Sequence, residues 1–120
     1  MPNVLLAEDE FLIRAVLVDA LGEAGFTCVE APTGQDALDV LASDQALAAV
    51  IVDLGLPDMP GTKVIEAAAK HRPGTPIIQC SGSNTTAPAI EGGKVHVFLK
   101  PYNPAQLSKF VAALVARGGA

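Results

Sequence analysis

The sequence predicts an α/β fold, a three-layer sandwich around a parallel five-stranded sheet, and three observations support this prediction. Five short apolar runs recur along the chain without the alternation that a half-exposed strand would show. Helical patterns separate most of these runs, as expected for parallel strands joined by right-handed crossovers. The length of 120 residues fits one domain, residues 1–120, with a core of its own.

The predicted strands are four or five residues long in most cases and nearly free of polar side chains. They span residues 4–7, 27–29, 49–52, 77–80 and 95–99. Continuous apolar runs of this length are typical of strands that are covered on both faces of a sheet. We therefore expect helices above and below the sheet.

Three helices are predicted in the first part of the chain. The first spans residues 11–24, and the second begins after Thr33, an N-cap with Asp36 three residues further on. The third follows Gly61 and ends with basic residues just before Pro73. Each has a start or stop signal in the local sequence.

The last helix has the clearest boundaries. Asn103 is its predicted N-cap, Pro104 occupies the first turn, and Gln106 completes a capping box. Four apolar residues then recur at helical spacing and predict its buried face: Leu107, Phe110, Val111 and Leu114. Between residues 83 and 93, prolines and glycines predict only a short or frayed helix.

Composition and charge exclude several classes of protein. Eight basic against thirteen acidic residues give a formal net charge of −5, which argues against a nucleic-acid binder. No apolar run approaches the ~18 residues of a membrane span, and the N-terminus lacks the basic segment of a signal peptide. Cys28 and Cys80 share no metal-ligand spacing and are expected to be buried thiols. We expect a cytoplasmic protein with no direct nucleic-acid or membrane partner.

Polar residues follow the predicted strands at the points where they end. Glu8 and Asp9 follow the first strand, Asp53 the third, Ser81 the fourth and Lys100 the fifth. Ligands of open α/β sheets bind at this edge, where the carboxyl ends of the strands meet. Neighbouring carboxylates repel one another and require a hard cation, Mg²⁺ or Mn²⁺. A carboxylate, a divalent metal, a lysine and a hydroxyl are together the groups needed to accept a phosphoryl group.

With these residues in order, the sequence resembles the receiver domain of two-component response regulators over essentially its whole length. The residues that carry the resemblance are Glu8, Asp9, Asp53, Pro57, Gly61, Ser81, Gly82, Lys100 and Pro101. Any one of them is a weak signal, but the ordered set at the strand ends is very specific. The resemblance implies a flavodoxin-like fold with strand order 2-1-3-4-5.

The resemblance also implies a metal-binding set. Asp53 would be the phosphoacceptor and one of the Mg²⁺ ligands, and Asp9 would bind Mg²⁺ directly. Glu8 would bind it directly or through water, and the backbone carbonyl of Gly55 would complete the protein ligands.

Further roles follow from the same resemblance. Lys100 would contact the phosphoryl group, Ser81 would be the switch hydroxyl, and the bond before Pro101 would be cis. The implied partners are a sensor histidine kinase or phosphotransfer protein as donor, and an unidentified downstream protein. Such a receiver is not an enzyme, although it assists its own phosphorylation and dephosphorylation. The chain ends just after the last helix, which favours a stand-alone receiver.

The first helix is apolar on more than one side. Four residues are predicted to point to the sheet: Ile13, Leu17, Ala20 and Ala24. Leu12, Ala15 and Val18 lie on other sides, either as part of a broad stripe covered by the last helix or as an exposed contact surface. The resemblance favours the second interpretation, with Leu12 and Ala15 contacting the kinase.

The predicted switch departs from the family. Val97 stands where many receivers have an aromatic ring, and Phe98 has the opposite strand parity. Pro88 weakens the helical pattern in the segment that follows Ser81. We therefore expect phosphorylation to order residues 82–94 rather than to rotate an aromatic side chain.

Other functions fit the sequence less well. A phosphatase of the haloacid-dehalogenase type needs an aspartate two residues after Asp53, where this chain has Gly55. A flavodoxin needs a hydroxyl-rich phosphate loop where this chain has Glu8 and Asp9. The remaining alternative is a receiver-like adaptor that binds partners without being phosphorylated, against which the complete set of acids, Ser81 and Lys100 argues.

Overall fold

The computed structural model describes residues 2–81, 95–99 and 103–118 of the chain. Its five strands are β1 (Asn3–Ala7), β2 (Thr27–Ala31), β3 (Ala49–Asp53), β4 (Ile77–Ser81) and β5 (Val95–Leu99). All paired strands run parallel, in the order β2-β1-β3-β4-β5. The predicted fold class and strand order are confirmed.

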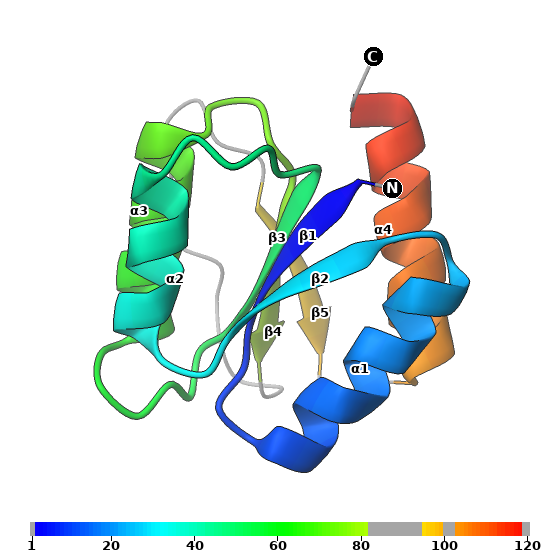
Figure 1. The fold of residues 1–120 in the computed structure, drawn as a ribbon, viewed down its shortest axis with the longest axis horizontal. Coiled ribbons are helices and arrows are strands. Elements are labelled where there is room, and N and C mark those ends of the chain that lie inside the picture. Colours follow the sequence, from blue (N-terminus) through cyan, green and yellow to red (C-terminus); the bar gives the residue numbers. More distant parts are fainter. Residues whose placement is uncertain (1, 82–94, 100–102, 119–120) are drawn as a thin grey trace.

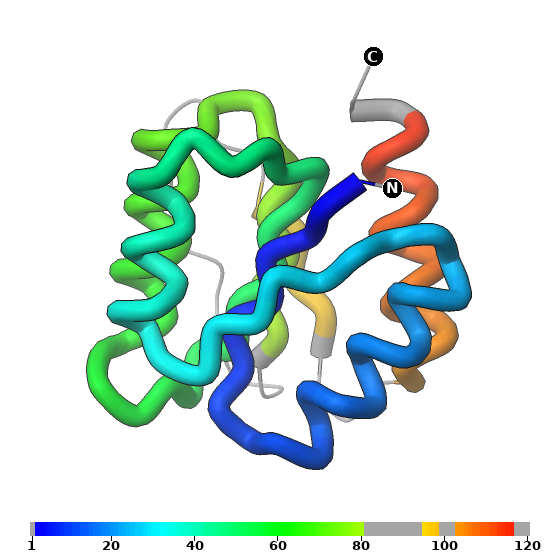
Figure 2. Tube along the Cα trace, in the orientation of Figure 1, coloured from blue at the N-terminus to red at the C-terminus, as the bar shows by residue number. Residues whose placement is uncertain are grey.

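Four helices in the described residues cover the two faces of this sheet. They are α1 (Phe11–Glu23), α2 (Gly34–Ala42), α3 (Gly61–His71) and α4 (Pro104–Gly118). Figure 1 shows α1 and α4 on one face and α2 and α3 on the other, and Figure 2 shows the chain crossing between the layers. Among these helices, none combines the length and the apolar character needed to cross a membrane.

The core consists of two apolar clusters, one on each face of the sheet. Side chains along β1 alternate between the two clusters. Leu6 packs on the side of α1 and α4, and its neighbours Leu5 and Ala7 pack on the side of α2 and α3. Because β1 and β3 bury both faces, their sequences are continuously apolar. The carboxyl ends of these central strands are thereby held at one edge of a rigid layer.

The helix ends follow the predicted signals closely. The Thr33 hydroxyl accepts a hydrogen bond from the Asp36 N–H at 3.1 Å, which confirms the N-cap of α2. Asn103 Oδ1 accepts from the N–H of Ala105 at 2.8 Å and caps α4 in the same way. Gly25 follows α1 with a φ of +98°, a conformation that glycine adopts without strain.

The predicted inner face of α1 needs one correction. Leu17 is buried as predicted, but Ala24 is exposed and Leu21 is the second buried residue of the helix. Ala24 is the C-cap residue of α1, after the last helical residue Glu23 and just before the chain leaves the helical path at Gly25.

The two predicted faces of β5 are confirmed. Phe98 packs on the α4 side, where its ring centroid lies 5.5 Å from that of Phe110. His96 packs on the same side, edge-on to Phe110 at 5.7 Å, while Val97 is exposed. Residues 82–94, where we expect ordering on phosphorylation, and Pro101, with its expected cis bond, lie outside the described residues.

Arg72 ties the ends of α2 and α3 together. Its guanidinium donates hydrogen bonds to four backbone carbonyls after or near the end of α2: those of Val40, Leu41, Ser43 and Gln45. Carbonyls at a helix C-terminus lack partners in the next turn of the helix, and Arg72 is one of the donors that satisfy them here. These hydrogen bonds join residues 40–45 to Arg72, and neither segment is close in sequence to Glu8 and Asp9.

Gln79 is a polar residue within the core. It lies on β4 between Val52 of β3 and Val97 of β5, and its side chain is fully buried. In the part of the chain that the structure describes, neither its Oε1 nor its Nε2 has a hydrogen-bond partner. Such an amide costs ~1–3 kcal/mol of stability.

We expect Gln79→Met to raise the free energy of unfolding by about 1–2 kcal/mol, because methionine has a similar volume and no polar group to satisfy. Urea denaturation of both proteins measures the difference. An equal or lower free energy in the variant would show that the Gln79 amide is hydrogen-bonded in solution.

Candidate functional site

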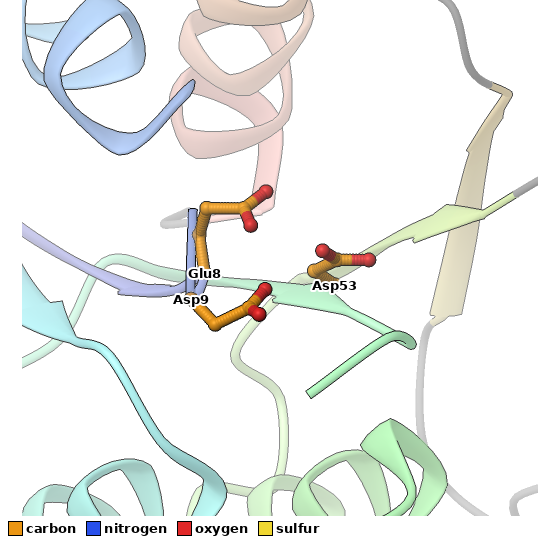
Figure 3. A group of neighbouring side chains, drawn as sticks. All are labelled: Glu8, Asp9 and Asp53. Atoms are coloured by element: carbon orange, nitrogen blue, oxygen red, sulfur yellow. The ribbon is translucent and has the colours of Figure 1, made fainter. Parts of the chain in front are cut away.

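Three carboxylates meet at the carboxyl edge of the sheet. Glu8 and Asp9 come directly after β1, and Asp53 is the last residue of β3. Because β1 and β3 are neighbours with Ala7 opposite Val52, the residues after Ala7 and Val52 come close together. One oxygen from each carboxylate lies within 4.8 Å of the others, and Figure 3 shows the three side chains as one group.

Backbone donors hold two of these carboxylates in place. The N–H of Glu10 donates to Glu8 Oε2 at 3.0 Å, and the N–H of Gly55 donates to Asp53 Oδ1 at 3.1 Å. The side chains of Glu8 and Asp53 are buried, while that of Asp9 is half-buried. Neighbouring negative charges in a buried place are costly unless a cation compensates them.

The donor set fits a hard divalent cation. Mg²⁺ binds oxygen ligands at about 2.0–2.1 Å in an octahedron, so its ligand atoms lie ~3–4 Å apart. The three carboxylate oxygens, within 4.8 Å of one another, reach that spacing with small side-chain movements. No softer sulfur or imidazole ligand belongs to this group in the described residues.

Gly61 lets the loop after β3 pack tightly under the site. Its N–H donates to the carbonyl of Leu54 at 3.4 Å. A Cβ at this position would lie 2.6 Å from Leu54 Cα and 2.8 Å from the carbonyl oxygen of Asp53. Because these neighbours are backbone atoms next to the site, only glycine fits there without moving them.

Asp58 ties the same loop to α2, and sequence reasoning missed it. Its carboxylate accepts from the N–H groups of Gly34 at 2.7 Å and Gln35 at 3.0 Å, the first turn of α2. These backbone hydrogen bonds lower the pKa of Asp58 below its ordinary value. The contact therefore stabilises the folded protein above the ordinary pKa, and this stabilisation is lost as the pH falls through the folded pKa. No local pattern marks this residue, because its partners lie 24 and 23 positions away.

The other predicted site residues are accounted for as follows. Gly55 lies beside Asp53, to which its N–H donates. Ser81 is the last residue of β4, and its side chain is outside the described part of the structure. Lys100 lies outside the described residues as well. Glu8, Asp9 and Asp53 are thus the predicted residues that the structure brings together.

The cysteines do not form part of this site. Cys80 is buried and Cys28 is half-buried, and neither forms a disulfide within the part of the chain that the structure describes. Burial, with a smaller contribution from the charge of Glu30, raises the pKa of Cys28 to about 11. This thiol is protonated at neutral pH and therefore a poor nucleophile, as expected for a packing residue.

Comparisons with known proteins agree with this geometry. The family model of the response regulator receiver domain matches residues 4–112. Transcriptional regulatory protein SrrA of Staphylococcus aureus (strain NCTC 8325 / PS 47) is 32% identical over 118 residues, which are 96% of this chain and 48% of that protein. The chain thus spans about half the length of the curated relatives it matches.

Two solved structures show the same fold. Chemotaxis protein CheY4 of Vibrio cholerae is 27% identical with a TM-score of 0.79, over 94% of this chain and 98% of that one. A CheY-like receiver domain protein from Methanospirillum hungatei JF-1 is 24% identical with a TM-score of 0.84, over 99% of this chain and 97% of that one. With its fold, its acidic cluster and its family match, the chain belongs to the receiver domains of two-component response regulators.

Proposed function

We propose that this receiver accepts a phosphoryl group on Asp53 in a Mg²⁺-dependent reaction and signals through protein contacts. The observation that carries the proposal is the cluster of Asp53 with Glu8 and Asp9, whose ligand oxygens lie within 4.8 Å at the carboxyl edge of the sheet. The donor is a sensor histidine kinase or a phosphotransfer protein. The proposal takes residues 1–120 as one domain that works in the cytoplasm, on neither nucleic acid nor membranes.

Each residue has a defined role in this reaction. Glu8, Asp9, Asp53 and the carbonyl of Gly55 would hold Mg²⁺, which when bound offsets the charge of the carboxylates and of the incoming phosphoryl oxygens. A carboxylate oxygen of Asp53 attacks phosphorus in line. The new O–P bond forms as the bond from phosphorus to the donor breaks, and the donor group leaves with the electron pair. The Gly55 N–H, already on Asp53 Oδ1, orients the carboxylate for this attack.

Two further residues keep the roles that the resemblance implies. Lys100 contacts the phosphoryl group as a point charge, and Ser81 acts as the switch hydroxyl. The domain assists its own phosphorylation and dephosphorylation, but it acts as a phosphoacceptor rather than as an enzyme that turns over many substrates. The alternative is a receiver-like adaptor that binds partners without phosphorylation.

The intact mass of the protein after incubation with acetyl phosphate and Mg²⁺ tests this proposal. We expect one added phosphoryl group, and we expect excess EDTA to prevent the addition, because the crowded carboxylates exclude another anion unless a cation is bound. No addition with Mg²⁺ present would favour the adaptor. Undiminished addition in EDTA would contradict the role of the metal.

The exposed side of α1 is the proposed contact surface for the kinase. Leu12 is 75% exposed, Phe11 69% and Val16 50%, whereas Ala15 is half-buried between them. Large apolar side chains exposed together are typical of a binding surface. Because α1 begins two residues after Asp9, a partner helix docked on this surface would hold its phosphohistidine close to Asp53.

We expect Leu12→Asp to slow phosphotransfer from the cognate kinase by ~10-fold or more, because a charge then replaces a central apolar contact. Phosphorylation by acetyl phosphate, which needs no docking surface, should be unchanged and serves as the control. Phosphotransfer rates with both donors provide the comparison. Equal loss with both donors would indicate damage to the site, and unchanged transfer from the kinase would exclude Leu12 from the contact.

A further inference from the structure

Arg14 is a charged side chain that the proposed function does not yet use. It lies in α1, its side chain is only 13% exposed, and its Nη1 donates to the carbonyl oxygen of Glu8 at 2.9 Å and to that of Asp9 at 3.4 Å. Its Nε donates to Glu30 Oε1 on β2 at 2.9 Å. Phe11 covers one side, with its ring centroid 5.7 Å from Arg14 Cζ.

The shape of the guanidinium makes these contacts interdependent. Its N–H donors are fixed in a planar fork, so a carboxylate on Nε sets the direction of the neighbouring Nη1. Glu30 belongs to β2, which is paired with β1 along its whole length. The salt bridge to Glu30 therefore holds Nη1 against the carbonyls of Glu8 and Asp9 from a strand that is paired with β1.

The Glu8 N–H donates to the Ala31 carbonyl at 3.1 Å and the Glu10 N–H donates to Glu8 Oε2 at 3.0 Å, but neither of these bonds involves the carbonyls of Glu8 and Asp9. Glu10 is the N-cap residue of α1, and its side chain makes no capping hydrogen bond. Arg14 is thus a cross-link from α1 to the two residues that precede the cap. Carbonyls held in one orientation restrict the backbone torsions of Glu8 and Asp9, and thereby the directions in which their Cα–Cβ bonds leave the chain.

We propose that Arg14 is a positioning residue for the metal site: it holds the backbone of Glu8 and Asp9 so that their carboxylates converge where Mg²⁺ binds. This inference rests on the proposed function, since it concerns the affinity of that same site for Mg²⁺. Arg14 donates to carbonyl oxygens and leaves the carboxylates available to the cation.

Charge and positioning predict opposite effects when Arg14 is replaced. A positive charge close to the site repels Mg²⁺, so removal of that charge alone would strengthen binding. Loss of the fork would instead release the loop and weaken binding, by ~10-fold or more if Arg14 acts like other groups that orient metal ligands. The direction of the change therefore separates the two effects.

The experiment is calorimetric titration of the unphosphorylated protein with Mg²⁺, together with the free energy of unfolding of each variant. We expect the affinity of Arg14→Met for Mg²⁺ to fall ~10-fold or more, although the net charge of this variant is more negative than that of the parent protein. Arg14→Lys keeps the charge but has no fork, and we expect weaker binding there too. Arg72→Ala is the matched control, because Arg72 also holds backbone carbonyls, but those at the end of α2. The stability of this variant should fall, while its affinity for Mg²⁺ should stay at the parent value.

Each other outcome has a definite meaning. Equal or tighter binding in Arg14→Met would overturn the positioning role, and so would full affinity in Arg14→Lys, because a charge would then be enough. If Arg14→Met does not fold, Arg14→Lys decides alone. Absence of Mg²⁺ binding by the parent protein would instead contradict the proposed function, so the two failures are distinguishable.

Discussion

Asp53→Asn is expected to lose all phosphoryl incorporation from acetyl phosphate and Mg²⁺, because an amide oxygen is no substitute for a carboxylate nucleophile. Intact-mass spectrometry measures the loss. Asp44→Asn is the matched control: Asp44 is an exposed aspartate between α2 and β3, and this variant should be phosphorylated like the parent. Phosphorylation that persists in Asp53→Asn would exclude Asp53 as the acceptor.

Although Asp53→Asn should abolish phosphorylation, we expect it to raise the stability of the folded protein. Two unit charges within 4.8 Å of one another repel by ~3.5 kcal/mol or more at an effective dielectric constant of about 20. Without Mg²⁺, we therefore expect Asp53→Asn to unfold with a free energy ~1–3 kcal/mol higher than the parent. Saturating Mg²⁺ stabilises the parent more than the variant and should narrow this difference. Urea denaturation with and without Mg²⁺ measures both quantities.

Gly61→Ala is expected to lower the free energy of unfolding by about 1–3 kcal/mol, with a fall in melting temperature of roughly 4–12 °C. The added Cβ would lie 2.6 Å from Leu54 Cα and 2.8 Å from the Asp53 carbonyl oxygen. Backbone atoms do not rotate away as a side chain does, so the start of α3 or the end of β3 must move. Such a shift at Asp53 should also slow its phosphorylation.

Gly22→Ala is the control for that variant. Gly22 lies in α1, and an added Cβ there meets no atom within 4 Å. Alanine is favoured over glycine in a helix by up to ~1 kcal/mol, so this variant should be as stable as the parent or more stable. If both alanine variants show the same change in melting temperature, the close approach at Gly61 is not the cause of the stability change in Gly61→Ala.

Much of the fold was predictable because its signals are local or strictly periodic. Strands covered on both faces are continuously apolar, as β1 and β3 are. Thr33 and Asn103 cap helices through hydrogen bonds to residues two or three positions away, so short sequence patterns contain both partners. The acidic cluster was predictable for a related reason, since parallel strands end at one edge of the sheet.

The features that sequence reasoning missed depend on contacts across the fold. Asp58 caps a helix from another loop, and Arg14 joins Glu30 across sixteen positions, so neither has a short-range pattern. The exposed residues Phe11 and Val16 were missed because α1 is apolar on several sides, and periodicity then gives no preferred face. Only the position of the neighbouring helix decides which side is covered.

The most direct test of the central claim is to locate the phosphoryl group by peptide mass spectrometry. After reaction with acetyl phosphate and Mg²⁺, borohydride reduces an aspartyl phosphate to homoserine, a stable mark at the modified position. We expect this mark at residue 53, at the end of β3, and nowhere else in the chain. A phosphorylated protein whose mark or phosphate lies on another residue, with Asp53 unmodified, would contradict the assignment of Asp53 as the phosphoacceptor.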